Sequence, residues 1–512
     1  MSDLRPPPRP AVVALLVGAL PAAFLLAHLG LPLVEDSLFW WVPRALWLTE
    51  HGPAWVAAGD LPRACLTGGA LPPQWSGGLP DYGHPPLWFH YLAGWLALLG
   101  PYAWALRLAC LPPAALLGWS AVALARRIGG PAASPLALLV LAAPPVLAQV
   151  LRPDTDLPLL ALSLTALVAL ADGRPWRFAL LAALAAWIKE PAVLLTVPAA
   201  VLGLRDRRML AAAAAGPAAL ALWVTIHRAA TGWALAGAER LPPSLGAWLG
   251  DLAAVLHLTF AATGRWIAPL LLLAGLAAAR ARPTMPPSPP GHATARRTAL
   301  ILAVFAAAQI AVFSVLNFLG GRDVAQGYTH VRYLLPGAAA ALLLLGGLGG
   351  RALLRALPVL GAHPLRAWAL LGLLTVAVAL PGSHRLHPRG PEATLFGRDQ
   401  ALAWVQAAAA LPALRPPEGS IWVESHVYTA LTQPWAGLVP DALEGLRPSS
   451  PDLLPDELHP GDLLVHCSYG EPLGRLGELS LDPVVRFDVH QAWVRVDRVL
   501  PGRAAPPPSS AR

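Results

Sequence analysis

Lysine is almost missing from this chain. Of 37 basic residues, Lys189 alone is lysine and the other 36 are arginine. Charged residues are scarce as well, at 13% of 512 residues, whereas 56% of the residues are hydrophobic and the mean hydropathy is +0.54. This composition is too apolar for an ordinary soluble protein, and it indicates a multi-span membrane protein.

Three further features are scarce or missing. The three cysteines (Cys65, Cys110 and Cys467) have no metal-ligand spacing. The net charge of +8 comes mostly from arginine pairs between apolar segments, with no polybasic run. The sequence also has no glycine-rich phosphate loop and no internal repeat. These absences argue against a nucleic-acid partner and a nucleotide-sugar donor, and membrane orientation explains the arginines better.

Apolar windows of 15 to 23 residues recur along residues 1–383, each bounded by arginine or by a Gly/Pro-rich break. This pattern is typical of transmembrane helices rather than of barrel strands. About 11 spans are predicted, at about 11–31, 108–125, 134–151, 157–171, 178–188, 191–204, 209–226, 260–279, 298–320, 334–350 and 367–381. Arginines collect in the loops of one side, which predicts a plasma (inner) membrane protein with a cytoplasmic N-terminus.

The stretch "WIKEPAV", residues 187–193, interrupts one apolar segment. "RPWR" precedes this segment and "RDRR" follows it, so two short arms keep both basic clusters on one side. The break is predicted at Lys189-Glu190-Pro191, because proline lacks an amide donor and disfavours a helical residue before it. Arms of 11 and 14 residues rise about 17 to 21 Å, so the turn must lie within a hydrocarbon core of about 30 Å.

A lysine at this depth costs roughly 3 kcal/mol and needs a partner. One interpretation places Lys189 at the floor of a cavity open to the outside, where its ammonium meets a phosphate or carboxylate. The alternative is a structural ion pair with Glu190 or with an aspartate. The first interpretation is favoured because non-helical backbone inside a membrane must be buried or line a wet cavity.

Acidic residues gather on the predicted outer side. The loop 32–107 begins with Glu35 and Asp36, and two of its segments are predicted to be interfacial helices. Asp154 and Asp156 form a second acidic pair where a span begins. Carboxylates here could act as a general base or bind a divalent cation, although acids also favour helix starts for structural reasons.

Five short motifs then occur in a definite order: "ED" after the first span, "HPPLWF", "RPDTDLPLL", "KEPAVLL" and "VRYLLPG". Over residues 11–381 this order resembles the GT-C superfamily, in particular protein O-mannosyltransferases and lipid A aminoarabinose transferases. The resemblance implies a cell-envelope glycosyltransferase, hexosyl or pentosyl, that uses a polyprenyl-phosphate sugar. Its acceptor would be a lipid, a glycan or a protein on the extracytoplasmic face.

The resemblance also implies roles for individual residues. The catalytic acids would be Asp36, with Glu35 beside it, and Asp156, less surely Asp154. The carrier phosphate would be bound by Lys189, Arg332 and Tyr333. Arginine offers two donors to a phosphate and lysine a compact charge.

Two positions depart from the family. Glu190 stands where a glycine is common after the lysine, and Gly83-His84 stands where the aminoarabinose transferases carry an acid and a lysine. His84 is therefore only a candidate for phosphate binding. A metal site stays unassigned, with a divalent cation the one cofactor left open.

After residue 383 the pattern changes. Residues 397–412 are amphipathic and predicted to be a helix, and "SIWVES", "GDLLVHC", "VVRFDV" and "QAWVRVDRVL" are typical of strands. A small extracytoplasmic α/β domain is predicted over 384–500, followed by a disordered tail at 501–512.

Two other function classes compete with the enzyme. A transporter or flippase of a lipid-linked or anionic substrate also uses broken helices and charged cavities, but it predicts inverted repeats, which this sequence does not show. An inactive partner subunit would have no need to keep Asp36, Asp156, Lys189 and Arg332 together.

Overall fold

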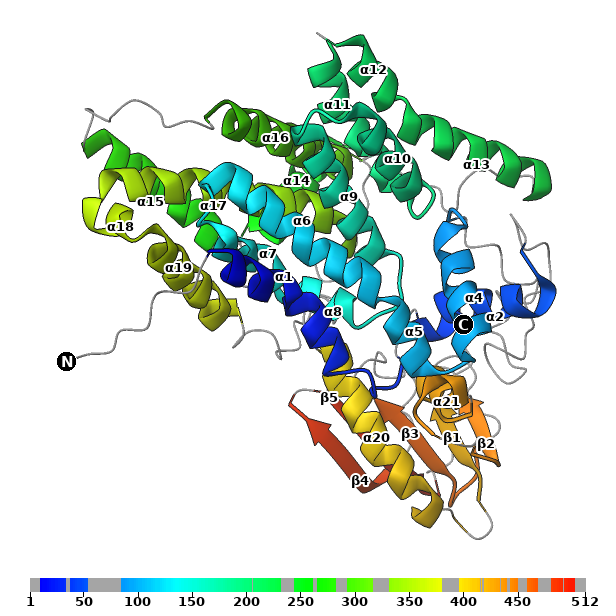
Figure 1. The fold of residues 1–512 in the computed structure, drawn as a ribbon. Helices are drawn as coiled ribbons and strands as arrows, with labels where there is room; N and C mark the ends of the chain where they lie inside the picture. Colours follow the sequence, from blue (N-terminus) through cyan, green and yellow to red (C-terminus); the bar gives the residue numbers. More distant parts are fainter. Residues whose placement is uncertain are drawn as a thin grey trace. The chain divides into compact units, whose positions relative to one another are not determined.

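The structure is a computed structural model, and it is mostly helical (Figure 1). It describes residues 10–33, 37–53, 84–204, 206–231, 244–260, 265–281, 292–315, 331–379, 396–414, 416, 419–432, 434–439, 443–449, 458–467, 480–490 and 492–501. The chain divides into two compact units. The helical unit comprises Met1–His28, Tyr82–Tyr91 and Arg107–Leu395, and the mixed unit comprises Leu29–Asp81, Leu92–Leu106 and Phe396–Arg512.

Long apolar helices dominate the helical unit. Within the described residues, four helical stretches are long and apolar enough to cross a membrane: Ala103–Gly129, Arg207–Ala229, Ala293–Val315 and Arg332–Ala356. They correspond to α5 with α6 (Ala103–Ala109 and Leu111–Gly129), α12 with α13 (Arg207–Ala213 and Ala215–Thr231), α16 (His292–Val315) and α17 (Val331–Ala356).

The structure also contains shorter helices. They are α1 (Pro10–Leu26), α4 (Leu87–Leu99), α8 (Pro144–Val150), α9 (Asp156–Ala171), α10 (Pro175–Ala186), α11 (Thr196–Gly203), α15 (Ile267–Ala281), α18 (Pro358–Ala362) and α19 (Pro364–Ala379). Helices α1 and α6 approach closely because Gly118 lies directly against the backbone of Gly18. Any side chain at Gly118 would overlap that backbone, so two glycines set this contact.

The break predicted at Lys189 is confirmed. Helix α10 ends at Ala186, Lys189 is extended with φ −158° and ψ 141°, and the 3-10 helix η4 (Glu190–Leu195) follows. The extended residue is Lys189 itself, and Glu190, which precedes the proline, already belongs to η4.

The two-arm interpretation of this segment also agrees with the packing of α10 on α13. A Cβ atom at Gly216 would lie 3.5 Å from the Ala182 carbonyl oxygen. Five residues further along α10, the Trp187 indole donates to the carbonyl of Ala219, 2.7 Å away. The two helices therefore run in the same direction. Between them, the chain must return to the end of the bundle at which α10 begins.

Two segments differ from the sequence prediction. The continuous span predicted at 134–151 is instead three short pieces, η3 (Ser134–Ala137), α7 (Leu138–Leu141) and α8, because Pro144 and Pro145 interrupt the hydrogen-bond ladder. Helix α14 (Leu245–Phe260) forms within a stretch that was predicted to be a loop.

The mixed unit contains one sheet with the strand order β2-β1-β3-β5-β4. The strands are β1 (Ile421–Glu424), β2 (Leu446–Ser449), β3 (Leu463–Cys467), β4 (Leu481–Val489) and β5 (Ala492–Val499). Strand β1 pairs in parallel with β2 and β3, whereas β5 pairs antiparallel with β3 and β4. The predicted helix at 397–412 and the four predicted strands are confirmed as α20 (Phe396–Leu414), β1, β3, β4 and β5; β2 and α21 (Ser425–Thr432) were missed.

Candidate functional site

The centre of the site is an ion pair between α9 and the end of α10. Asp156 is the first residue of α9, and Lys189 follows the last turn of α10. The Lys189 Nζ lies 2.6 Å from Asp156 Oδ1, and both side chains are completely buried. Because α9 and α10 pack along each other, the start of one and the end of the other meet at the same end of the bundle.

The start of α17 adds a second cation and an aromatic ring. Arg332 Nε lies 3.6 Å from Asp156 Oδ2, and the Arg332 side chain is 7% exposed. The Lys189 ammonium lies 3.8 Å from the centroid of the Tyr333 ring, a distance at which a cation and an aromatic face attract each other. The structure thus brings together four of the predicted site residues, Asp156, Lys189, Arg332 and Tyr333.

The centre holds charges of both signs. The Lys189 and Arg332 cations approach the Asp156 carboxylate, and the Glu190 carboxylate also interacts electrostatically with Lys189. Cations fixed in this way can stabilise an anionic group such as a phosphate.

His84 lies beside the centre and pairs with Glu190. Its Nδ1 is 3.0 Å from both carboxylate oxygens of Glu190. Two hydrogen bonds at the start of α4 hold His84 there: the Trp88 indole donates to the carbonyl of Pro153, and the amide of Leu87 donates to the carbonyl of Trp187. The two positions at which the sequence departs from the family are thus in contact with each other.

Asp154 belongs to a different buried group. It interacts electrostatically with Arg107, whose guanidinium donates to the carbonyl of Leu151. Arg152 and Cys110 are neighbours in the same group, since the Cys110 thiol donates to the Arg152 carbonyl 3.4 Å away. Neither Arg107 nor Arg152 was singled out from the sequence, although a buried arginine next to an acid could have suggested an ion pair.

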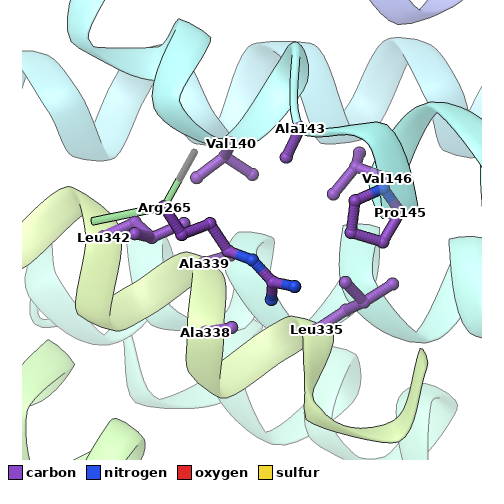
Figure 2. Close-up of a pocket in the computed structure, with 9 residues that line it drawn as sticks. All are labelled: Val140, Ala143, Pro145, Val146, Arg265, Leu335, Ala338, Ala339 and Leu342. Carbon is purple, nitrogen blue, oxygen red and sulfur yellow. The ribbon is translucent and has the colours of Figure 1, made fainter. Parts of the chain in front are cut away.

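Arg265 is a further cation that the sequence analysis missed. It is 4% exposed and lines a cavity of about 10 Å³ with apolar residues of α8 and α17. Figure 2 shows its guanidinium pointing toward Pro145 and Leu335. Such a volume is at the lower limit for one water molecule. In the sequence, Arg265 resembles the arginines at the edges of apolar segments that signal orientation, so the sequence alone does not set it apart.

The first predicted acidic pair, Glu35 and Asp36, lies outside the described residues. Within the part of the chain that the structure describes, no three metal-ligating side chains gather into a cluster. The described residues of the site supply the Asp156 and Glu190 carboxylates together with the Lys189 and Arg332 cations.

Comparison with solved structures identifies the fold. The chain is similar to ArnT from Cupriavidus metallidurans bound to undecaprenyl phosphate, with a TM-score of 0.52 and 17% identity over 95% of this chain and 97% of that one. The apo structure of the same ArnT gives a TM-score of 0.51 and 16% identity over 94% and 97%. No protein-family profile and no curated protein matches the sequence. The predicted resemblance to lipid A aminoarabinose transferases is thereby confirmed at the level of the GT-C fold.

Proposed function

We propose that this protein is an integral-membrane glycosyltransferase that moves a sugar from a polyprenyl-phosphate carrier to an acceptor hydroxyl. The observation that carries the proposal is the buried centre in which the Lys189 and Arg332 cations both approach Asp156. The similarity in fold to ArnT supports it, because one ArnT structure is bound to undecaprenyl phosphate.

In the proposed reaction, the acceptor oxygen forms a bond to the anomeric carbon of the sugar. The bond from that carbon to the carrier phosphate breaks, and the phosphate leaves with the electron pair. A carboxylate takes the hydroxyl proton, and we assign this role to Asp36 with Glu35 beside it. The negative charge that develops on the phosphate needs fixed cations nearby.

The geometry suggests different tasks for the two cations. Arg332 is the more exposed of the two, and its guanidinium can offer paired donors to phosphate oxygens, so we assign it to direct binding. Lys189 is completely buried against Asp156 and Tyr333, so it supplies charge from behind the phosphate. His84, paired with Glu190, is a third candidate for phosphate binding.

Asp156 then has a positioning role, because it holds both cations at once. Both interpretations of Lys189 are compatible with this geometry, since the lysine pairs with an aspartate and still contributes a cation to the centre. The reaction would take place on the extracytoplasmic side of an inner membrane, with the N-terminus in the cytoplasm.

The test is the release of free polyprenyl phosphate from a panel of polyprenyl-phosphate sugars by the purified protein in liposomes, with an acceptor-rich membrane extract supplied. Wild type should release the carrier, and Asp36→Asn should lower the release by about 100-fold or more, as expected for loss of a general base. If folded wild-type protein releases nothing but moves lipid-linked sugar across the bilayer, the protein is a flippase and the proposal is wrong.

A further inference from the structure

A charged cavity lies at the other end of α9, away from Asp156. It has a volume of about 570 Å³ and is lined by Ala171, Asp172, Arg174, Ala293, Thr294 and Arg297. These residues come from the end of α9, the turn before α10 and the first turns of α16, three helices that lie together in the helical unit (Figure 1). We call this the arginine cavity.

The carboxylate of the arginine cavity is already neutralised. Arg127 donates from Nη2 to both oxygens of Asp172, at 2.8 and 3.0 Å, and from Nε to one of them at 3.0 Å. Counting Asp172 as −1 and Arg127, Arg174 and Arg297 as +1 each gives a sum of +2. The cavity is therefore suited to bind an anion.

The guanidinium of Arg297 is held in place at the cavity wall. Its Nη2 donates to the Leu170 carbonyl, 3.0 Å away, at the end of α9. Gly173 makes room for it: this glycine has φ +67°, and a Cβ atom there would lie 3.3 Å from Arg297 Nη1. Arg174, the next residue, is exposed at the cavity. The first turn of α16 adds a weaker contribution, because helix N-termini favour anions.

The surroundings point to a lipid rather than to a soluble anion. Trp176 is 65% exposed and Leu180 is 53% exposed on α10, just after Arg174. Arg177 lies with its guanidinium carbon 5.1 Å from the centroid of the Trp176 ring. Exposed tryptophan beside arginine is typical of the boundary between membrane and water. Basic pockets between helices at this boundary are suited to anionic headgroups.

We propose that the arginine cavity binds the phosphate of an anionic phospholipid headgroup, between Arg174 and Arg297. This site is separate from the centre around Asp156 and does not depend on the proposed enzyme activity. Its ligand would be a structural lipid at the end of the bundle opposite to the carrier phosphate.

The test uses the full-length protein in phosphatidylcholine nanodiscs that contain a minor fraction of phosphatidylglycerol, with retained lipid counted by native mass spectrometry. Arg174→Ala should lower phosphatidylglycerol retention roughly fivefold, the effect of one arginine near an anionic lipid surface. Arg297→Gln should lower it at least as much. Arg208→Ala is the matched control, because Arg208 is exposed at the start of α12 and lies outside the cavity lining, and its replacement should change retention less than twofold.

Two results would overturn the proposal. If Arg208→Ala lowers retention as much as Arg174→Ala, the lipid responds to general surface charge and not to the cavity. If inorganic phosphate raises the melting temperature of wild type in uncharged detergent while Arg174→Ala leaves lipid retention unchanged, the ligand is a soluble phosphate. Arg174 is exposed, so its replacement should not disturb folding, and an unchanged monomer fraction in size-exclusion chromatography checks this.

Discussion

At the scale of single residues, the charges of the centre hold one another in place. Lys189 has a carboxylate on one side and an aromatic ring on the other, and Arg332 approaches the second oxygen of the same carboxylate. Removing one member of a buried pair leaves the other charge without its counterion. Changes at these positions therefore affect folding and chemistry together, and experiments have to separate the two effects.

Variants of Lys189 can separate the effect on folding from the effect on chemistry. We expect Lys189→Met to lower the free energy of unfolding by about 3 to 5 kcal/mol, because Asp156 loses its closest partner. Lys189→Met/Asp156→Asn should recover most of that stability without recovering activity.

Lys189→Arg keeps the charge but brings a larger planar group into the turn, so polyprenyl phosphate release should fall more than the yield of folded monomer. Equal losses of release and yield would contradict this expectation.

The contact between His84 and Glu190 predicts that the two residues act as a unit. His84→Ala and Glu190→Ala should each slow carrier release, and the double variant should be little slower than either single one. The coupling free energy from this cycle should be about 1 kcal/mol or more, as is usual for residues in direct contact. Release rates of the four proteins measure it, and strictly additive losses would show that the pair has no joint role.

The sequence predicted much of this centre, but not its contacts. Lys189 could be singled out because it is the only lysine, and its place at a break followed from Pro191. Whether Lys189 pairs with a phosphate, with Glu190 or with an aspartate depends on interatomic distances, which the hydrophobic periodicity of the sequence does not specify. Arg265 was missed for a similar reason: an arginine near the end of a span is usually an orientation signal, and only burial shows that it points inward.

At the scale of elements, the prolines explain where the sequence prediction succeeded and where it failed. Pro191 marks the break after α10 correctly, whereas Pro144 and Pro145 divide a segment that hydropathy alone joins into one span. Hydropathy averages over a window, so it detects apolar length but not a gap in hydrogen bonding. Four of the five strands in the mixed unit were predicted because they contain short runs of Val, Ile, Leu or aromatic residues, whereas β2, with the sequence LRPS, has no such run.

The sheet also makes a prediction about acid stability. Burial alone would raise the pKa of Asp497, but hydrogen bonds from His466 and Arg495 outweigh it and hold the pKa below the ordinary value. A lowered carboxyl pKa stabilises the fold above the unfolded pKa of about 3.9, and this stability is lost as pH falls through the folded pKa.

Thermal unfolding of the full-length protein between pH 3 and pH 7 measures this effect. Wild type should lose stability below about pH 4, and Asp497→Asn should be less stable at pH 7 but lose less on acidification. Asp488→Asn is the control, because Asp488 is 53% exposed on the neighbouring strand, and it should follow wild type. Parallel curves for wild type and Asp497→Asn would show that Asp497 contributes nothing to the acid sensitivity.

At the scale of the whole molecule, the distribution of arginine predicts which side each segment faces. The stretch 280–297 carries four arginines and is predicted to be cytoplasmic, whereas the C-terminal tail is predicted to be outside. In a Cys65→Ser background, a membrane-impermeant thiol reagent applied to intact cells should label Ser510→Cys but not Ser288→Cys. The reverse labelling pattern would invert the predicted orientation and move the proposed reaction to the cytoplasmic face.

The pairing of Lys189 with Asp156 also bears on how the chain enters the membrane during synthesis. The two residues are only 33 positions apart, and the carboxylate is made first. The lysine therefore emerges when its counterion is already in the neighbouring helix, and the two arms can be inserted as part of a neutral group rather than with an isolated ammonium. Arg332, made much later, joins a pair that is already complete.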